Sequence, residues 1–249
     1  MPTVTFPEAM SRVLRGDAAR PLVTFYDDAS GERTELSVAT YANWVAKTAG
    51  LAQDELGVEH GALALLDLPT HWLGAVWLGA AWTMGLCVTD DRAAADRADL
   101  IVCGPDRWQE YTARALDVPV VALSLRPMGG RFTQPLPAAV TDYGAVVLAQ
   151  PDVFVADAPP DGADLAWRDA VGTLSQADLL RDRTDETTAE AGGRLLTDVN
   201  PCSRSGLSTL LTPLAGHGST IWVAHPDPAT WSAKYDAERA TRQVLAVSG

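Results

Sequence analysis

Residues 72–88 form an uncharged stretch of seventeen residues that contains three tryptophans. A membrane-spanning helix needs about 20 apolar residues, usually with basic or aromatic anchors at its ends. This stretch is shorter, follows a Pro-Thr-His sequence and is closed by two aspartates. We therefore predict no membrane span, but a helix over residues 70–84 that protein covers on several sides, with Thr70 as its N-cap.

Short apolar runs flank this helix at residues 62–68 and 85–89, and both have the length of buried strands. Strand, helix and strand make a βαβ unit, in which the strands pair in parallel. The alternation continues, with strands predicted at 21–26, 99–104, 117–125, 194–200 and 219–225, and helices at 36–56, 105–116, 175–183, 206–216 and 228–240. We expect an α/β fold with doubly wound, mostly parallel sheets and flanking helices.

The length of 249 residues suits a single α/β domain, residues 1–249. A segment rich in proline and glycine, residues 126–143, interrupts the alternation of strands and helices. We expect it to separate two βα lobes, 1–130 and 140–249.

Charge and cysteine content argue against several classes of partner. The net charge is −13 and no Lys/Arg cluster occurs, which argues against nucleic acid and anionic membrane surfaces. The three cysteines have no paired or zinc-binding spacing, and no two histidines lie three or four residues apart. The N-terminus lacks a basic segment followed by an apolar core, so we expect a cytoplasmic protein.

Two blocks of the sequence resemble a known family. Residues 36–90 contain LSVATYANWVAKTAG, a Gly-Val and a Gly before an apolar strand, and then LPTHW at the start of the apolar helix. Residues 192–241 contain GGRLLTDVNPCSRSGLSTLLTPLAGHGSTIWVAHPDPATW. In this order they resemble segments of the AMP-binding, adenylate-forming enzymes, which include acyl-CoA synthetases and peptide-synthetase adenylation domains. The resemblance implies the fold of the first part of their large domain.

The chain departs from this family where ATP would be bound. The family's phosphate loop is a Gly/Ser/Thr-rich run that ends in Pro-Lys-Gly, and only Gly172-Thr173 remain of it here. Lys47 and Lys234 lie in predicted helices outside any phosphate motif. The family's magnesium and ribose motifs and its small C-terminal domain are also missing. We therefore expect a truncated relative without a cofactor of its own, since ATP, AMP or CoA is implied by the resemblance alone.

Candidate ligand-binding residues follow from the sheet topology. Ligands of open α/β sheets bind beyond the carboxyl ends of the strands. The residues predicted at these ends are Asp67, Thr70, His71, Gly104, Ser124, Asn200, Ser203 and His225. Backbone amides at residues 203–206, where a helix begins, could bind an anion together with Arg204, and the alternative is a plain helix cap. We predict no catalytic residue and no metal ligand.

The leading hypothesis is a non-catalytic, acyl-CoA-synthetase-like protein that binds a ligand or a partner. A second copy of the chain or another protein would cover the apolar surface left by the missing subdomains. One alternative is a subunit of a split adenylate-forming acyl-CoA ligase that needs a second chain for ATP binding. Another is an enzyme of unrelated chemistry, which a cleft with titratable groups of shifted pKa would indicate.

Overall fold

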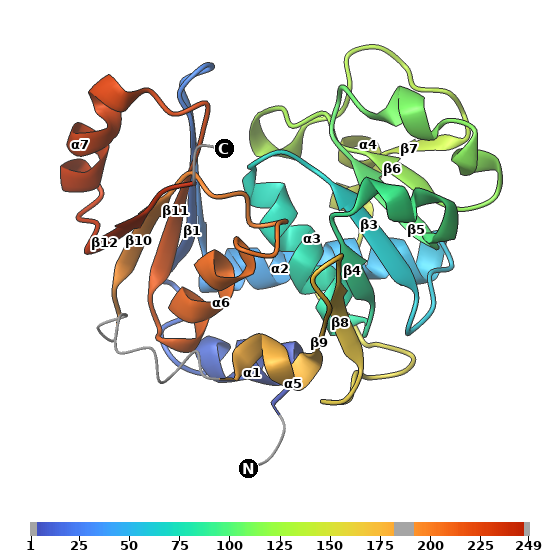
Figure 1. The fold of residues 1–249 in the computed structure, drawn as a ribbon, viewed down its shortest axis with the longest axis horizontal. Coiled ribbons are helices and arrows are strands. Elements are labelled where there is room, and N and C mark those ends of the chain that lie inside the picture. Colours follow the sequence, from blue (N-terminus) through green and yellow to red (C-terminus); the bar gives the residue numbers. More distant parts are fainter. Residues whose placement is uncertain (1–3, 182–191, 247–249) are drawn as a thin grey trace.

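The computed structural model of the chain describes residues 4–181 and 192–246. Two sheets form its frame, and helices pack between and outside them (Figure 1). The first sheet has the order β12-β10-β11-β1-β2, and its pairs are parallel except for the β1–β2 hairpin. Its strands are β1 (Pro21–Asp27), β2 (Glu32–Ser37), β10 (Arg194–Thr197), β11 (Ser219–Ala224) and β12 (Arg242–Val244).

The second sheet has the order β7-β6-β5-β3-β4-β8-β9. Its pairs are parallel except for β8 and β9, which form an antiparallel hairpin. Its strands are β3 (Leu63–Asp67), β4 (Cys87–Thr89), β5 (Leu100–Cys103), β6 (Val120–Ala122), β7 (Val140–Asp142), β8 (Leu165–Arg168) and β9 (Thr173–Ser175). The expected α/β fold with mostly parallel sheets is therefore confirmed.

Helices fill the space between the two sheets, and α7 covers the outer face of the first sheet (Figure 1). The short α4 follows β7 in the chain. The helices are α1 (Phe6–Leu14), α2 (Val38–Gly50), α3 (Trp72–Thr83), α5 (Gln176–Leu180) and α6 (Leu207–Ala215) in the middle layer, α7 (Pro228–Ala237) outside and α4 (Tyr143–Val146).

The uncharged stretch forms α3, at the centre of this middle layer. Every residue of α3 except Thr83 is buried, and its three tryptophans are at most 1% exposed. Gly79 lets α2 approach closely, because a Cβ there would lie 2.5 Å from the Tyr41 hydroxyl oxygen. The predicted buried helix is confirmed, and no helix in the described ranges is long and apolar enough to cross a membrane.

Two local predictions around the helices are wrong. The N-cap of α3 is His71 rather than Thr70, because His71 Nδ1 accepts a hydrogen bond from the Leu73 amide at 3.2 Å. The helix predicted at 105–116 is instead two 3₁₀ turns, Trp108–Tyr111 and Arg114–Leu116. Tyr111 is the buried residue of these turns, and Trp108 and Ala115 pack partly buried beside it.

The helix predicted at 36–56 begins later and changes its winding. Thr34 and Leu36 are buried while their neighbours face outward, so this segment belongs to β2. Ser37 ends the strand and caps α2, accepting a hydrogen bond from the Thr40 amide at 3.1 Å. After Gly50 the helix continues as a π-helical turn, Leu51–Glu55.

Both sheets draw strands from both halves of the chain. The first sheet joins β1 and β2 with β10, β11 and β12, and the second holds all the strands between them in sequence. A single large hydrophobic cluster contains residues from both sheets and from the helices between them. The division into lobes 1–130 and 140–249 stays a prediction.

Candidate functional site

The segments after the carboxyl ends of β3 and β10 meet between the two sheets. Asn200 Nδ2 donates a hydrogen bond to the Leu68 carbonyl at 2.7 Å. The Thr70 hydroxyl donates to the Asp198 carbonyl at 3.4 Å. Two of the predicted residues, Thr70 and Asn200, thus join the two sheets, and we refer to this place as the junction.

His71 lies at the junction as a buried, neutral imidazole. Its side chain is 3% exposed and meets the Phe25 ring edge-on, with 4.6 Å between ring centroids. Burial lowers the pKa of His71 to about 3, and Asp27 offsets this only in part. Because Nδ1 accepts from the Leu73 amide, the proton is on Nε2, which has no hydrogen-bond partner among the described residues. The ring can donate a hydrogen bond there, but it cannot act as a base through that atom.

Asn200 and Ser203 shape the turn that leads into α6. Asn200 Oδ1 accepts from the Cys202 amide at 2.9 Å. The Ser203 hydroxyl donates to the Asn200 carbonyl at 2.8 Å and accepts from the Gly206 amide at 3.1 Å. Both side chains are therefore engaged in local bonds of the kind that begin a helix.

Arg204 is paired with a carboxylate of the same chain. Its Nη1 lies 3.1 Å from Asp169 Oδ1, and the same carboxylate accepts from the Val171 amide at 2.8 Å and the Gly172 amide at 3.0 Å. Trp167 Nε1 adds a fourth donor at 2.8 Å. Burial opposes ionisation of Asp169, but these hydrogen bonds outweigh it and lower the pKa. The anion beside Arg204 is thus Asp169 itself.

The side chain of Asp67 lies on the other side of the second sheet, beside Tyr111. Asp67 accepts from the Tyr111 hydroxyl at 2.8 Å and from Arg92 Nε at 3.0 Å. The Gly104 amide donates to the Asp67 carbonyl at 3.1 Å. Tyr111 belongs to a hydrophobic cluster that is separate from the central one. This cluster also contains Leu65, which lies in β3 two residues before Asp67. Asp67 is therefore not part of the junction. Gly104 lies beside the junction, because a Cβ at Gly104 would be 3.2 Å from Pro69 Cδ.

The side chains of Ser124 and His225 make contacts that stabilise loops. The Ser124 hydroxyl donates to the Gly130 carbonyl and accepts from the Arg126 amide at 3.3 Å, which closes the loop after β6. His225 is exposed and lies 2.8 Å from Asp27. Burial raises the pKa of Asp27, but its hydrogen bonds, that from His225 first, bring it below the usual range. Neither residue reaches the junction through these bonds.

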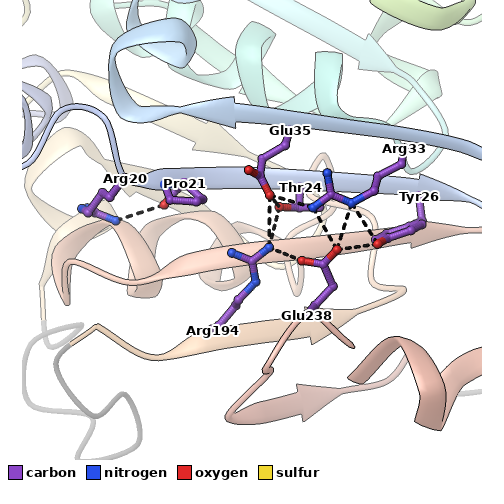
Figure 2. A network of polar contacts seen from close by, with 8 residues as sticks. All are labelled: Arg20, Pro21, Thr24, Tyr26, Arg33, Glu35, Arg194 and Glu238. Carbon is purple, nitrogen blue, oxygen red and sulfur yellow. Dashed lines mark hydrogen bonds and ion pairs between the residues drawn. The ribbon is translucent and has the colours of Figure 1, made fainter. Parts of the chain in front are cut away.

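A charged network, which the sequence did not predict, lies on the outer face of the first sheet (Figure 2). Glu238, just after α7, accepts from Arg33 Nε at 2.9 Å and also from Tyr26 and Arg194. Arg194 in turn donates to the Thr24 hydroxyl at 3.0 Å. Burial raises the pKa of Glu238, but its hydrogen bonds from Arg33 and Tyr26 outweigh this and lower it. The alternation of charged and buried residues in β2 is the signal that could have located this face.

The junction offers hydrogen-bond donors rather than reactive groups. The Asn200 amide and the Thr70 and Ser203 hydroxyls already donate within the chain. Among these groups, the buried N–H of His71 is the donor without a partner in the described residues. Residues 4–181 and 192–246 contain no group of three His, Cys, Asp or Glu side chains placed to hold a metal ion. The junction thus has one buried donor without a partner, and among Thr70, His71, Asn200 and Ser203 there is neither a charged group for phosphate nor an activated nucleophile.

Comparison with known proteins places the chain in a family. A Mycobacterium tuberculosis protein described as "TIGR03089 family protein" is 36% identical over 250 residues, covering 97% of this chain and 98% of that protein. The chain belongs to the TIGR03089 family. No family model matches it.

The fold of this TIGR03089 family member is that of an acyl-CoA synthetase. The crystal structure of Brucella canis acyl-CoA synthetase matches it with a TM-score of 0.79 and 15% sequence identity. The match covers 97% of this chain and 47% of the synthetase, so the chain spans about half of that enzyme. The resemblance found in the sequence is confirmed for the fold.

Proposed function

We propose that this protein is a non-catalytic relative of the acyl-CoA synthetases that binds a ligand or a partner protein. The observation that supports this most directly is the hairpin between β8 and β9. It contains Gly172-Thr173, the remnant of the family's phosphate loop. Its amides at Val171 and Gly172 already donate to the carboxylate of Asp169.

A triphosphate would need these same donors and a cation. The Asp169 carboxylate occupies the donors and would repel a phosphate by its own charge. Arg204 is paired with Asp169 at 3.1 Å. Lys47 is paired with Asp152 at 3.1 Å, and Lys234 with Asp28 at 2.9 Å. Each of these three cations is therefore already paired with a carboxylate of the chain, which supports a chain that does not stabilise the charge of adenylate formation.

Thermal unfolding with nucleotides tests the non-catalytic assignment. We expect no shift of the melting temperature with ATP–Mg²⁺, AMP, CoA or an acyl-adenylate analogue. A ligand at 100 times its dissociation constant would add about 2.7 kcal/mol, which corresponds to a shift of several degrees. An intact acyl-CoA synthetase in the same assay is the positive control. A shift with ATP would overturn the assignment.

Exposed apolar side chains support a partner-binding role. Leu148, Val153 and Val155 are 62%, 78% and 78% exposed and lie within one short segment after α4. Exposed apolar side chains gathered in one segment are candidates for a contact surface. Light scattering of the wild type and of Val155→Ser would show whether a second copy of the chain covers this segment. A monomer in both would leave the assignment to a ligand or another protein.

A second candidate is a subunit of a split adenylate-forming acyl-CoA ligase. The chain's match to 47% of the Brucella canis enzyme favours it, because a second chain could supply the rest. Its test is ATP–pyrophosphate exchange with and without a separately encoded chain that carries a phosphate loop. Exchange that needs both chains would move this candidate to first place.

A further inference from the structure

Residues 152–157, which we call the valine stretch, have the alternating exposure of an extended chain. Val153, Val155 and Asp157 are exposed, whereas Phe154 and Ala156 between them are half-buried. Side chains of an extended chain point alternately to two faces. Phe154 packs against the central hydrophobic cluster, so one face of the stretch is held by the core and the face with the valines is turned to solvent.

Gln53, in the π-helical turn Leu51–Glu55, pairs with one edge of the valine stretch as a neighbouring strand would. Its Nε2 donates to the Val155 carbonyl at 3.3 Å, and its Oε1 accepts from the Asp157 amide at 3.0 Å. In a sheet, the carbonyl of one residue and the amide of the next residue but one bond to the same neighbouring strand. This edge of the stretch is therefore occupied from within the chain.

Lys47 of α2 holds the beginning of the stretch. Its Nζ lies 3.1 Å from Asp152 Oδ1 and also donates to the Gln150 carbonyl. With the core contact of Phe154 and the two bonds of Gln53, the stretch is attached along its length. A partner that binds to it would not have to order it first, which lowers the entropic cost of binding.

The opposite edge of the valine stretch is open. In an extended chain, the backbone groups of residues 154 and 156 point away from those of residues 155 and 157. No hydrogen bond from the described residues reaches the amide or the carbonyl of Phe154 or Ala156. An edge with such open groups, beside exposed apolar side chains, is the kind to which a strand of another chain adds.

Prolines limit the length of this open edge. Pro151 precedes the stretch, Pro159 and Pro160 follow it, and none of the three has an N–H to donate. The Ala158 carbonyl already faces His60 Nδ1 at 3.2 Å. A partner strand can therefore pair with residues 152–157 and not far beyond them.

The charge around the valine stretch is acidic. Residues 150–164 include no lysine or arginine, and their charged residues are Asp152, Asp157, Asp161 and Asp164. Asp157 lies on the same exposed face as the two valines. A second copy of the chain would bring these aspartates against each other, and like charges opposite one another weaken strand pairing. The complementary partner is basic.

We propose that the valine stretch binds an extended, basic segment of another protein as an added strand. Two apolar residues of this segment, separated by one residue, cover Val153 and Val155. A lysine or arginine at the next alternate position lies beside Asp157. The proposal rests on the partner-binding role proposed above and specifies the chemistry of the partner.

Selection from a library of short random peptides, with the full chain as the target, tests this surface. We expect the selected peptides to share two apolar residues separated by one residue, with a lysine or arginine two positions from one of them. Selection that yields no binder, or binders without this alternation, overturns the proposal. The peptide that carries the shared sequence is then synthesised and titrated by fluorescence anisotropy.

Variants of the chain locate the site of this peptide. Val155→Ser should weaken its binding about tenfold, because an apolar side chain that the peptide covers is lost. Leu116→Ser is the matched control, since Leu116 is 82% exposed on another segment, and it should leave the affinity unchanged. Equal effects of the two substitutions would show that the peptide binds elsewhere.

Backbone pairing is tested with two forms of the peptide that are N-methylated at alternate residues, one form for each set. One form should lose binding and the other keep it, because only alternate N–H groups of a strand face its neighbour. Hydrogen exchange of the Phe154 and Ala156 amides should slow on binding, whereas that of Asp157, already bonded to Gln53, should not change. Equal binding of both forms overturns strand addition.

The result is separable from that of the nucleotide experiment. Failure of the peptide selection removes this partner but leaves the non-catalytic assignment, which depends on thermal unfolding with ATP–Mg²⁺, AMP, CoA and an acyl-adenylate analogue. A thermal shift with ATP overturns that assignment whether or not a peptide binds to the valine stretch.

Discussion

At the scale of single residues, His71 links the stability of the protein to pH. Its pKa is about 3 in the folded chain, against about 6.5 in an unfolded one. Between these values the unfolded chain binds a proton that the folded chain does not, so the free energy of unfolding decreases as the pH falls. We predict that the wild type loses stability from pH 7 to pH 5 faster than His71→Asn, by up to about 1.4 kcal/mol per pH unit below pH 6.5. Urea unfolding at both pH values measures this.

The slope with pH, rather than the absolute stability, is the diagnostic quantity. Asparagine keeps an acceptor for the Leu73 amide but leaves space beside Phe25, which costs roughly 1–3 kcal/mol at every pH. The carboxylates titrate alike in both proteins and cancel in the difference. Parallel pH curves would show that His71 is not a buried neutral base.

At the scale of elements, the charged network fixes α7 on the first sheet. Trp231 and Tyr235 of α7 pack on the outer face of that sheet, and Glu238 adds its contacts with two arginines. Glu238→Gln keeps the size of the side chain and removes its charge. We predict that amides of residues 228–246 then exchange about tenfold faster, as the loss of charge-assisted hydrogen bonds implies, while those of α3 do not change. Hydrogen exchange read by mass spectrometry measures both.

Glu35→Gln provides the matched control for this network. Glu35 contacts the same two arginines, but its side chain is 34% exposed, against 9% for Glu238. Water screens the exposed pair, so this change should have the smaller effect. Equal effects of the two substitutions would refute the anchoring role of Glu238.

The elements that the sequence predicted well are those with a strong apolar signal. The units β3–α3–β4 and β10–α6–β11 were predicted from apolar runs, whose side chains are buried in the folded chain. The strands β8, β9 and β12 have three or four residues each, as β4 does, but polar or charged side chains interrupt their apolar runs. Their pairing comes from neighbours distant in the sequence, which a local pattern does not contain.

At the scale of the whole molecule, parallel strands align their carboxyl ends, and this rule located the junction of Thr70 and Asn200. It did not tell which side chains face the junction. Asp67 lies on the other face of the sheet because side chains alternate along β3. The pair of Asp169 and Arg204 joins residues 35 positions apart, and nothing in either local sequence marks one as the partner of the other.

The distribution of strands between the two sheets also determines how the protein unfolds. Since β1 pairs with β11 and one hydrophobic cluster spans both sheets, neither half of the chain holds a complete core. We predict a single unfolding transition in calorimetry, with the calorimetric and van't Hoff enthalpies equal. Residues 1–130 expressed alone should show no cooperative transition, because β1 then lacks its parallel neighbour and α3 loses its contacts with Ala166, Gln176 and Cys202. Two transitions in the intact chain, or a fragment that melts cooperatively, would instead establish the two lobes as separate folding units.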